Sequence, residues 1–144
     1  MTTTTFRTLA GALLVALLAV TTPAAGPLSR TFQFERRAPL ELGLVDRHGL
    51  RIDTVRFLLP DAAARTAGVA RADVAISNTS TVALRVGLAV ALFDAEGALV
   101  GVASGGTRFR GLKPGRQDTY SLTFDHVNER IHSAATFQIT LESE

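Results

Sequence analysis

Large apolar residues alternate with smaller residues along residues 82–92. The large side chains are those of Val82, Leu84, Val86, Leu88, Val90 and Leu92. Successive side chains of a β-strand point to opposite faces, so a repeat of two is typical of a strand with one buried face. The pattern predicts a single strand over 82–92 with its large side chains toward a core. The positions between them are mostly alanine and glycine, which indicates that the second face is thinly covered or closely approached.

Shorter segments on both sides of this strand repeat the alternation. Their apolar positions are Phe32 and Phe34, then Leu40, Leu42 and Leu44, then Ile52, Val55 and Phe57, then Ala70, Ala72, Val74 and Ile76, then Tyr120, Leu122 and Phe124, and finally Ala135, Phe137, Ile139 and Leu141. Turn-forming sequences separate the segments at 46–49 (DRHG), 77–80 (SNTS), 94–97 (DAEG) and 112–115 (LKPG). Strands this short and this regularly spaced predict an all-β sandwich or barrel of about seven to nine strands.

Two segments depart from this regular pattern. Residues 99–103 continue as a strand up to the sequence SGG at 104–106, where we expect a bulge or bend before the strand resumes over 107–110. Residues 61–66 (DAAART) predict a short helical turn, with Asp61 as its cap.

The first 25 residues differ from the rest of the chain. Arg7 carries their one charge, an apolar run follows over 9–20, and small residues then surround Pro23. A short charged start, an apolar middle and a small-residue exit are the parts of a secretory signal peptide. The apolar run is shorter than the roughly 20 residues that cross a membrane. We expect 1–25 to be a cleaved signal peptide, with an uncleaved membrane anchor as the alternative, and 26–144 to be a single domain in the periplasm or outside the cell.

Charge and cysteine content exclude several functional classes. The chain has 15 basic and 13 acidic residues, and the predicted signal peptide contains only one of the basic ones, so the mature chain is nearly neutral. This balance argues against a nucleic-acid partner or a membrane-surface charge footprint. The chain has no cysteine, which excludes disulfides, thiolate metal sites and a cysteine nucleophile. We expect no membrane span after signal cleavage.

Three motifs resemble a known family. Residues 75–80 (AISNTS), 91–97 (ALFDAEG) and 112–115 (LKPG) are similar to small bacterial domains of the FxLYD type, over about residues 70–142. Val90 stands where the family has its name-giving phenylalanine, and Phe93 replaces the tyrosine. The resemblance implies an immunoglobulin-like antiparallel β-sandwich in an exported or membrane-tethered protein. It implies no particular reaction, since a fold of this kind does not determine a function.

The chain's best cluster of metal-ligating residue types lies in residues 125–132, which begin with Asp125. If this segment were helical, His126, Glu129 and His132 would follow one another at spacings of one turn and could converge on a metal ion. The two histidines are nearly two turns apart, which stretches such a site. The alternative is a polar connection between two strands. We favour the connection, and keep a periplasmic metal- or small-ligand-binding protein as the alternative function.

Four cationic residues, Arg108, Arg110, Lys113 and Arg116, lie within nine residues of one another. If 107–110 is a strand, Arg108 and Arg110 share a face and can hold a carboxylate, a phosphate or an anionic glycan. The alternative is a charged edge strand that discourages pairing with other sheets. We favour the second interpretation, because most charge runs are solvated faces.

No sequence pattern indicates catalysis. No serine stands in a nucleophile-elbow glycine pattern, and the glycine pair at 105–106 lacks the following helix of a phosphate-cradling loop. The sequence NTS at 78–80 fits the N-glycosylation pattern, for which a turn between strands is the alternative. We therefore expect a non-enzymatic interaction or structural module of the bacterial cell envelope, with no cofactor, whose partner is another envelope or secreted protein.

Overall fold

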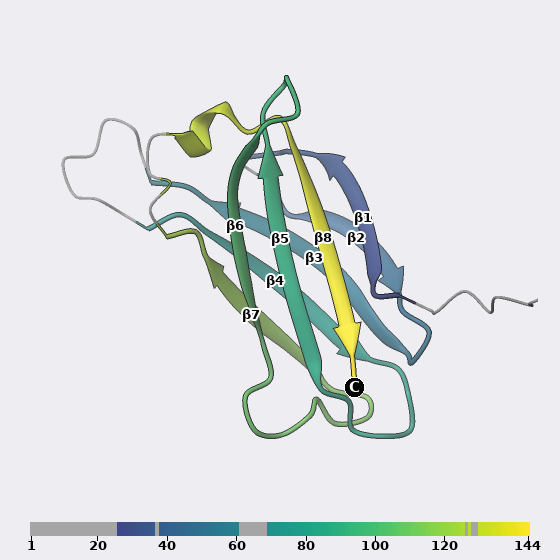
Figure 1. Ribbon diagram of the computed structural model, residues 1–144. Helices are drawn as coiled ribbons and strands as arrows, with labels where there is room; N and C mark the ends of the chain where they lie inside the picture. The colour runs from purple at the N-terminus through teal and green to yellow at the C-terminus, as the bar shows by residue number, and fades with distance from the viewer. Residues whose placement is uncertain (1–25, 37, 61–68, 126, 128–129) are drawn as a thin grey trace, which may run out of the picture.

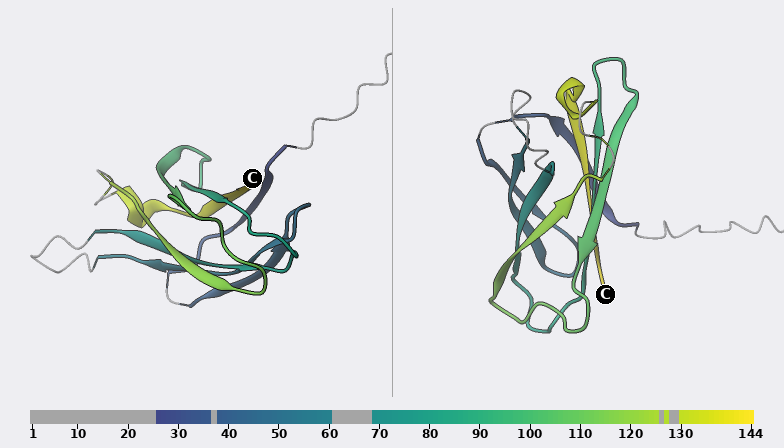
Figure 2. Two further views of the ribbon diagram at one scale, coloured as in Figure 1. Left: turned by 90° about the horizontal axis from the view of Figure 1, so that it is seen from below. Right: turned by 90° about the vertical axis from the view of Figure 1, so that its left-hand side faces the viewer.

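The computed structural model describes residues 26–36, 38–60, 69–125, 127 and 130–144. These residues form eight β-strands and one 3-10 turn: β1 (Leu28–Gln33), β2 (Leu40–Val45), β3 (Leu50–Leu58), β4 (Arg71–Asn78), β5 (Val86–Phe93), β6 (Leu99–Gly106), β7 (Gln117–Thr123), η1 (Arg130–Ser133) and β8 (Thr136–Ser143). Two four-stranded sheets face each other as a sandwich (Figure 1, Figure 2). The predicted all-β sandwich is confirmed. The predicted signal peptide and the predicted helical turn at 61–66 lie outside the described residues.

All neighbouring strands are antiparallel. The strand order is β1-β8-β5-β6 in one sheet and β2-β3-β4-β7 in the other. The chain passes through β2, β3 and β4 as neighbours and crosses to the facing sheet for β5 and β6. It then returns for β7 beside β4, and crosses again to place β8 between β5 and β1. The edge strands β6 and β7 lie next to each other along one flank of the sandwich (Figure 1).

The core fills the space between the sheets. On β5 the buried large residues are Val86, Leu88, Val90 and Leu92, as the alternation predicts. Phe57 of β3 meets Phe137 of β8 edge-to-face at a centroid distance of 5.0 Å, and Phe32 of β1 stacks on Phe137 at 5.4 Å. Burying one large apolar side chain contributes about 1.5–3 kcal/mol, and an aromatic pair adds about 0.5–1.5 kcal/mol. This packing explains how a cysteine-free chain holds its fold.

The predicted strand over 82–92 is too long at its start. β5 begins only at Val86, and Val82 is 58% exposed instead of facing the core. Leu84 is buried, but it forms an isolated bridge to Leu112: Leu112 N donates to Leu84 O at 2.7 Å, and Leu84 N donates to Leu112 O at 3.1 Å. Residues 79–85 thus form a loop. This loop is hydrogen-bonded to a distant segment of the chain and not to a neighbouring strand.

The predicted resumption of a strand over 107–110 is wrong, because β6 ends at Gly106. The side-chain oxygen of Thr107 accepts a hydrogen bond from Val86 N at 3.0 Å, and Thr107 N donates to Val86 O at 2.9 Å. These bonds occupy the backbone groups at the start of β5, so the sheet ladder stops there. A Cβ on Gly106, whose φ is 153°, would lie 1.9 Å from Val86 O. Only glycine lets the chain leave the sheet along this path.

Three of the predicted turns are confirmed. In the turn at 46–49, Gly49 N donates to Asp46 O at 3.3 Å, and in the turn at 94–97, Gly97 N donates to Asp94 O at 3.1 Å. Both glycines have positive φ values, 96° and 81°, which side chains disfavour. The turn at 112–115 is closed by a bond from the backbone nitrogen of residue 116 to the carbonyl of residue 113 at 3.1 Å.

Three loops meet at one end of the sandwich, which we call the loop end: 46–49, 79–85 and 107–116. Thr79 N donates to Gly49 O at 2.8 Å, and Gly115 N donates to the backbone oxygen of the last residue of β4 at 2.8 Å. The loop end lies at the bottom of Figure 1, next to the C-terminus. Within the part of the chain that the structure describes, no helix has the length and hydrophobicity needed to cross a membrane.

Candidate functional site

Asn78, the last residue of β4, organises the backbone of the loop end. It is buried, with only 1% of its surface exposed. Its Nδ2 donates to the carbonyl oxygens of Val82 at 2.8 Å and Leu112 at 2.7 Å. Its Oδ1 accepts from the backbone nitrogen of Ser80 at 2.9 Å and from the Ser80 hydroxyl at 2.7 Å. One side chain therefore joins β4, the 79–85 loop and the segment that leads into β7.

The NTS sequence at 78–80 thus has a structural role. Both hydrogens of the Asn78 amide are donated to backbone carbonyls, and the amide is buried. The folded chain does not present this nitrogen for modification. The turn is the better interpretation of the motif.

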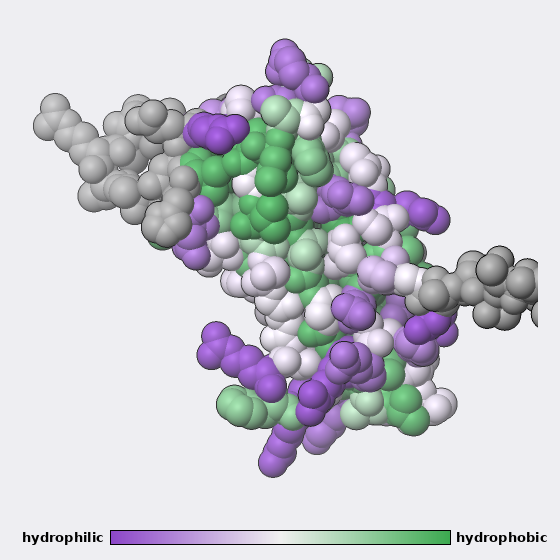
Figure 3. Space-filling model, in the orientation of Figure 1, coloured by the Kyte–Doolittle hydropathy of each residue, from purple (hydrophilic) through white to green (hydrophobic). Residues whose placement is uncertain are grey.

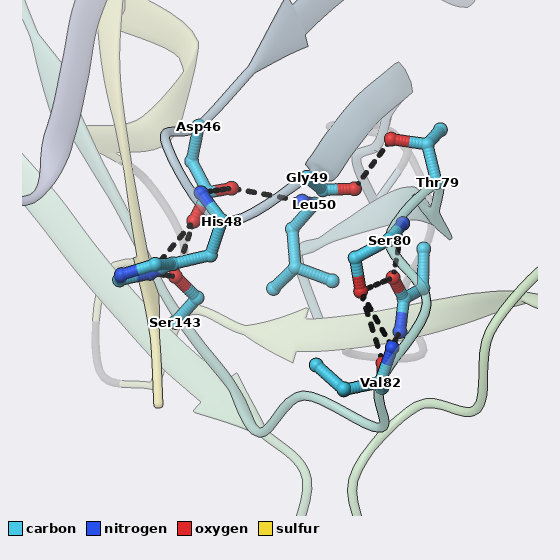
Figure 4. A network of polar contacts seen from close by, with 9 residues as sticks. Asp46, His48, Gly49, Leu50, Thr79, Ser80, Val82 and Ser143 are labelled. Carbon is cyan, nitrogen blue, oxygen red and sulfur yellow. Dashed lines mark hydrogen bonds and ion pairs between the residues drawn. The ribbon is translucent and has the colours of Figure 1, made fainter.

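Asp46, His48 and Ser143 form a second polar cluster at the loop end (Figure 4). Ser143 Oγ donates to Asp46 Oδ2 and also contacts Nδ1 of His48. Asp46 Oδ1 accepts from the backbone nitrogens of His48 at 3.0 Å and Leu50 at 2.8 Å. Nδ1 of His48 lies 3.9 Å from Asp46 Oδ2. The cluster fastens the 46–49 turn to the last strand.

The residue types of this cluster match a Ser-His-Asp triad, but its geometry does not. In a triad the serine donates its proton to one imidazole nitrogen, and the carboxylate holds the other nitrogen. Here Ser143 donates to Asp46, and both residues lie at the same nitrogen of His48. The serine proton is therefore directed to the Asp46 carboxylate and not to the imidazole of His48. The sequence gives no signal for this cluster, because Ser143 and Asp46 are 97 residues apart.

A groove of about 550 Å³ lies beside this cluster, between the start of β1, the 46–49 turn and the end of β8. Arg30 and Arg47 line it together with Asp46 and Glu142. Because both signs of charge are present, the groove favours no ligand charge.

Asp53 is a buried carboxylate at a bulge in β3, and only 9% of it is exposed. Arg51 Nε donates to its Oδ1 at 2.5 Å, and the hydroxyl of Ser77 and Nε2 of Gln117 donate to its Oδ2, the latter at 3.2 Å. These donors come from β3, β4 and β7. The carboxylate therefore ties three strands together, and its hydrogen-bonding capacity is used within the sheet.

The four cationic residues singled out in the sequence all lie in the loop end, but none lies in a strand. Arg108 and Arg110 belong to an exposed bend, so they do not share a strand face, and the edge-strand interpretation is also wrong. Phe109 stands between them and is 88% exposed. No described carboxylate lies within 4 Å of Arg108, Arg110, Lys113 or Arg116. Figure 3 shows strongly hydrophilic side chains gathered at this end of the molecule.

Three of these cations line one pocket. Arg110, Lys113 and Arg116 surround a pocket of about 600 Å³, which Asp118 and Tyr120 of β7 also line. The three cations outnumber the one carboxylate, which leaves a surplus of two positive charges. Arg108 does not line the pocket. The sequence placed these residues near one another, but only the fold separates the pocket-lining cations from the one at the tip of the loop.

The hydroxyl of Tyr120 is buried and has no hydrogen-bond partner among the described residues. Burial raises the pKa of Tyr120 above its usual value, and the nearby charge of Asp118 raises this pKa further. The phenol is therefore protonated at neutral pH and can donate a hydrogen bond. Buried polar groups almost always have a partner, so this hydroxyl is an unusual feature of the sandwich.

The predicted metal-ligating segment is only partly described. His126 and Glu129 lie outside the described residues. Asp125 is exposed, and His132 lies in the 3-10 turn η1, where its backbone oxygen accepts from the guanidinium of Arg36. Over the described ranges, no three histidine, cysteine or acidic residues lie close enough to hold a metal ion. A metal site at 125–132 stays a prediction.

Comparisons with known proteins add no family to this geometry. No family model matches the chain, and searches of curated proteins and of solved structures found no match either. The resemblance to FxLYD-type domains therefore stays a prediction, and the case for a function depends on the residues of the loop end.

Proposed function

We propose that the chain is an exported, non-catalytic β-sandwich of the bacterial cell envelope, which binds another envelope or secreted protein through the exposed bend at residues 108–110, the tip of the 107–116 loop. The observation that carries the proposal is Phe109, which stands 88% exposed between two arginines. Export rests on the signal peptide predicted for residues 1–25.

The composition of this tip favours a protein partner. Aromatic residues and arginine are enriched in protein interfaces, and a few such residues supply most of the binding energy. Removing the Phe109 side chain from water contributes about 1.5–3 kcal/mol when it enters a partner's pocket. Arg108 and Arg110 have no described carboxylate within 4 Å, so both guanidinium groups are open to acidic residues of a partner.

We propose that the chain has no catalytic role because its best-placed polar side chains are hydrogen-bonded within the domain. Asp46, Asp53 and Asn78 all direct their hydrogen-bonding atoms to strands and loops of the same domain. Ser143 donates its proton to a carboxylate. Groups engaged in this way hold the fold, and a nucleophile or general base needs a free path to a reacting atom.

The proposal is tested with a photo-crosslinking amino acid placed at position 109 in the native host. A matched control carries the same amino acid in place of Leu99, which is 51% exposed at the start of β6, away from the loop end. We expect a specific protein adduct from position 109 that position 99 does not give. The same adducts from both positions, or none from position 109, would overturn the proposal.

Binding between the purified chain and the captured partner then gives the energetic test. Phe109→Ala should weaken the affinity at least tenfold, since hot-spot truncations lose about 2 kcal/mol or more. Leu99→Ala should leave the affinity unchanged. An equal response of the two variants would show that the tip of the loop is not the binding surface.

A further inference from the structure

The pocket lined by the 107–116 loop and β7 contains groups that, apart from Arg110, the proposed protein interaction does not use. Arg110, Lys113 and Arg116 stand opposite the one carboxylate of Asp118, and the phenol of Tyr120 completes this set. We infer that this pocket is a binding site for a phosphate dianion, either free or as the end group of a small molecule.

The charge of the pocket matches a dianion. The surplus of two positive charges equals in size the charge of a phosphate monoester above its second pKa, which is about 6. Arginine offers a planar fork of donors to phosphate oxygens, and lysine offers a compact point charge. Since no described carboxylate lies within 4 Å of these three cations, an entering anion does not have to break an ion pair there.

Tyr120 places part of its aromatic side chain in the wall of the pocket. Its hydroxyl oxygen is buried and has no hydrogen-bond partner among the described residues. A bound phosphate accepts a bond from this hydroxyl only if the side chain turns toward the pocket.

The backbone around the pocket is fixed before a ligand arrives. Leu112 O accepts from Asn78 Nδ2 at 2.7 Å, and Leu112 is also bridged to Leu84. A Cβ on Gly111 would lie 2.8 Å from backbone atoms of Leu84, so only glycine lets the two segments pass this closely. Lys113 directly follows this anchored residue in the chain. The loop therefore loses little conformational entropy when a small ligand binds, and this favours a high affinity.

The volume of the pocket indicates that the ligand can be larger than a phosphate ion. About 600 Å³ falls within the range of small-molecule sites, which is about 300–1,000 Å³. A phosphate monoester therefore has room for its organic part, and inorganic phosphate tests the anion-binding chemistry alone.

The chain contains its own reporter for this site. Tyr120 is its one tyrosine, and the chain has no tryptophan. Tyrosine fluorescence and the ultraviolet absorbance of the ionised phenol both report on the pocket, with no contribution from elsewhere in the chain.

The experiment titrates the purified chain with inorganic phosphate, with glycerol phosphate and with acetate, each against sodium chloride at equal ionic strength. We expect saturable fluorescence changes with both phosphates and a much weaker response to acetate, which carries one charge. Tighter binding of glycerol phosphate than of inorganic phosphate would assign the site to a monoester, and the reverse order to free phosphate. Bound phosphate should raise the pKa of Tyr120 further, because a nearby anion disfavours the phenolate.

Variants separate a built site from general attraction to a basic surface. Lys113→Gln and Arg116→Gln should each weaken phosphate binding about three- to tenfold, as expected for exposed charge-assisted contacts. Arg56→Gln removes an exposed arginine from β3, outside the pocket, and should change nothing. A phosphate response equal to that of chloride, or one that persists in the Lys113→Gln and Arg116→Gln variants, would overturn the inference. Both results are independent of the crosslinking at position 109, which needs the partner.

Discussion

Replacing Asn78 by alanine should lower the free energy of unfolding by about 2 kcal/mol. The change removes one of the two donors to the buried carbonyl of Leu112, which keeps its bond from Leu84 N, so this loss costs about 0.5–1.5 kcal/mol. The carbonyl of Val82 and the amide of Ser80 are less buried and can turn to water, so each of these losses is about 0.5–1 kcal/mol. Against a total stability of about 5–15 kcal/mol this is a large fraction, and it should lower the melting temperature by about 10 °C.

Urea unfolding followed by circular dichroism measures this change. Thr79→Ala is the matched control, because Thr79 lies in the same turn but is exposed and donates one side-chain bond, to Gly49 O at 2.7 Å. We expect the control to lose less than about 1 kcal/mol. The slope of the free energy against urea should stay the same in both variants, since the surface exposed on unfolding is unchanged. If Asn78→Ala lowers the free energy of unfolding no more than the control does, water replaces the hydrogen bonds of Asn78. The loop end is then more open to solvent than the structure indicates.

Three further predictions address the core, the end of β6 and the alkaline behaviour of the pocket. Leu88→Asp should unfold the domain, because it places an unpaired charge in the core, whereas Ala89→Asp on the outer face should cost much less; equal loss of the β-sheet circular dichroism signal would show that both faces are covered. Gly106→Ala should lower the unfolding free energy in urea by about 2 kcal/mol or more, since its Cβ would collide with a backbone carbonyl of β5; a wild-type midpoint would contradict this geometry. Because burial raises the pKa of Tyr120, the unfolded chain ionises first, so stability should fall as the pH rises above about 10 and stop falling once the folded phenol ionises. Tyr120→Phe should remove this fall, and urea midpoints measured across alkaline pH test it.

The alternation of apolar residues predicted the strands well where burial depends only on the direction in which neighbouring side chains point. Along β5, Leu88 and Val90 face the core because each strand residue points opposite to its neighbours. The ends of strands depend on distant partners, which periodicity cannot show. Val82 continues the alternating pattern but is exposed, because the chain pairs nearby Leu84 with Leu112 instead of with a strand.

The candidate site could be predicted only in part, for the same reason. The composition identified a cationic cluster, but whether its members face one pocket depends on where β6 ends and on the turn that leads into β7. Tyr120 fits the alternation of a core strand, and nothing in the sequence marks its hydroxyl as unpaired. The cluster of Asp46 and Ser143 joins a turn to the last strand, which are 97 residues apart in the sequence, so no local motif indicates it.

The bonds of Asn78 link the stability of the loop end to its binding chemistry. Its Nδ2 holds the carbonyl of Leu112, which directly precedes the pocket cation Lys113. Asn78→Ala should therefore weaken phosphate binding even at temperatures where the variant remains folded, because the loop must then be ordered when the ligand binds. A loss of about threefold corresponds to roughly 0.6 kcal/mol of ordering free energy. Thr79→Ala keeps the Leu112 anchor and should bind phosphate as the unaltered chain does. If both variants bind phosphate normally while Asn78→Ala is destabilised, the bridge between Leu84 and Leu112 and strand β7 suffice to position the pocket, and the Asn78 bond serves only the fold.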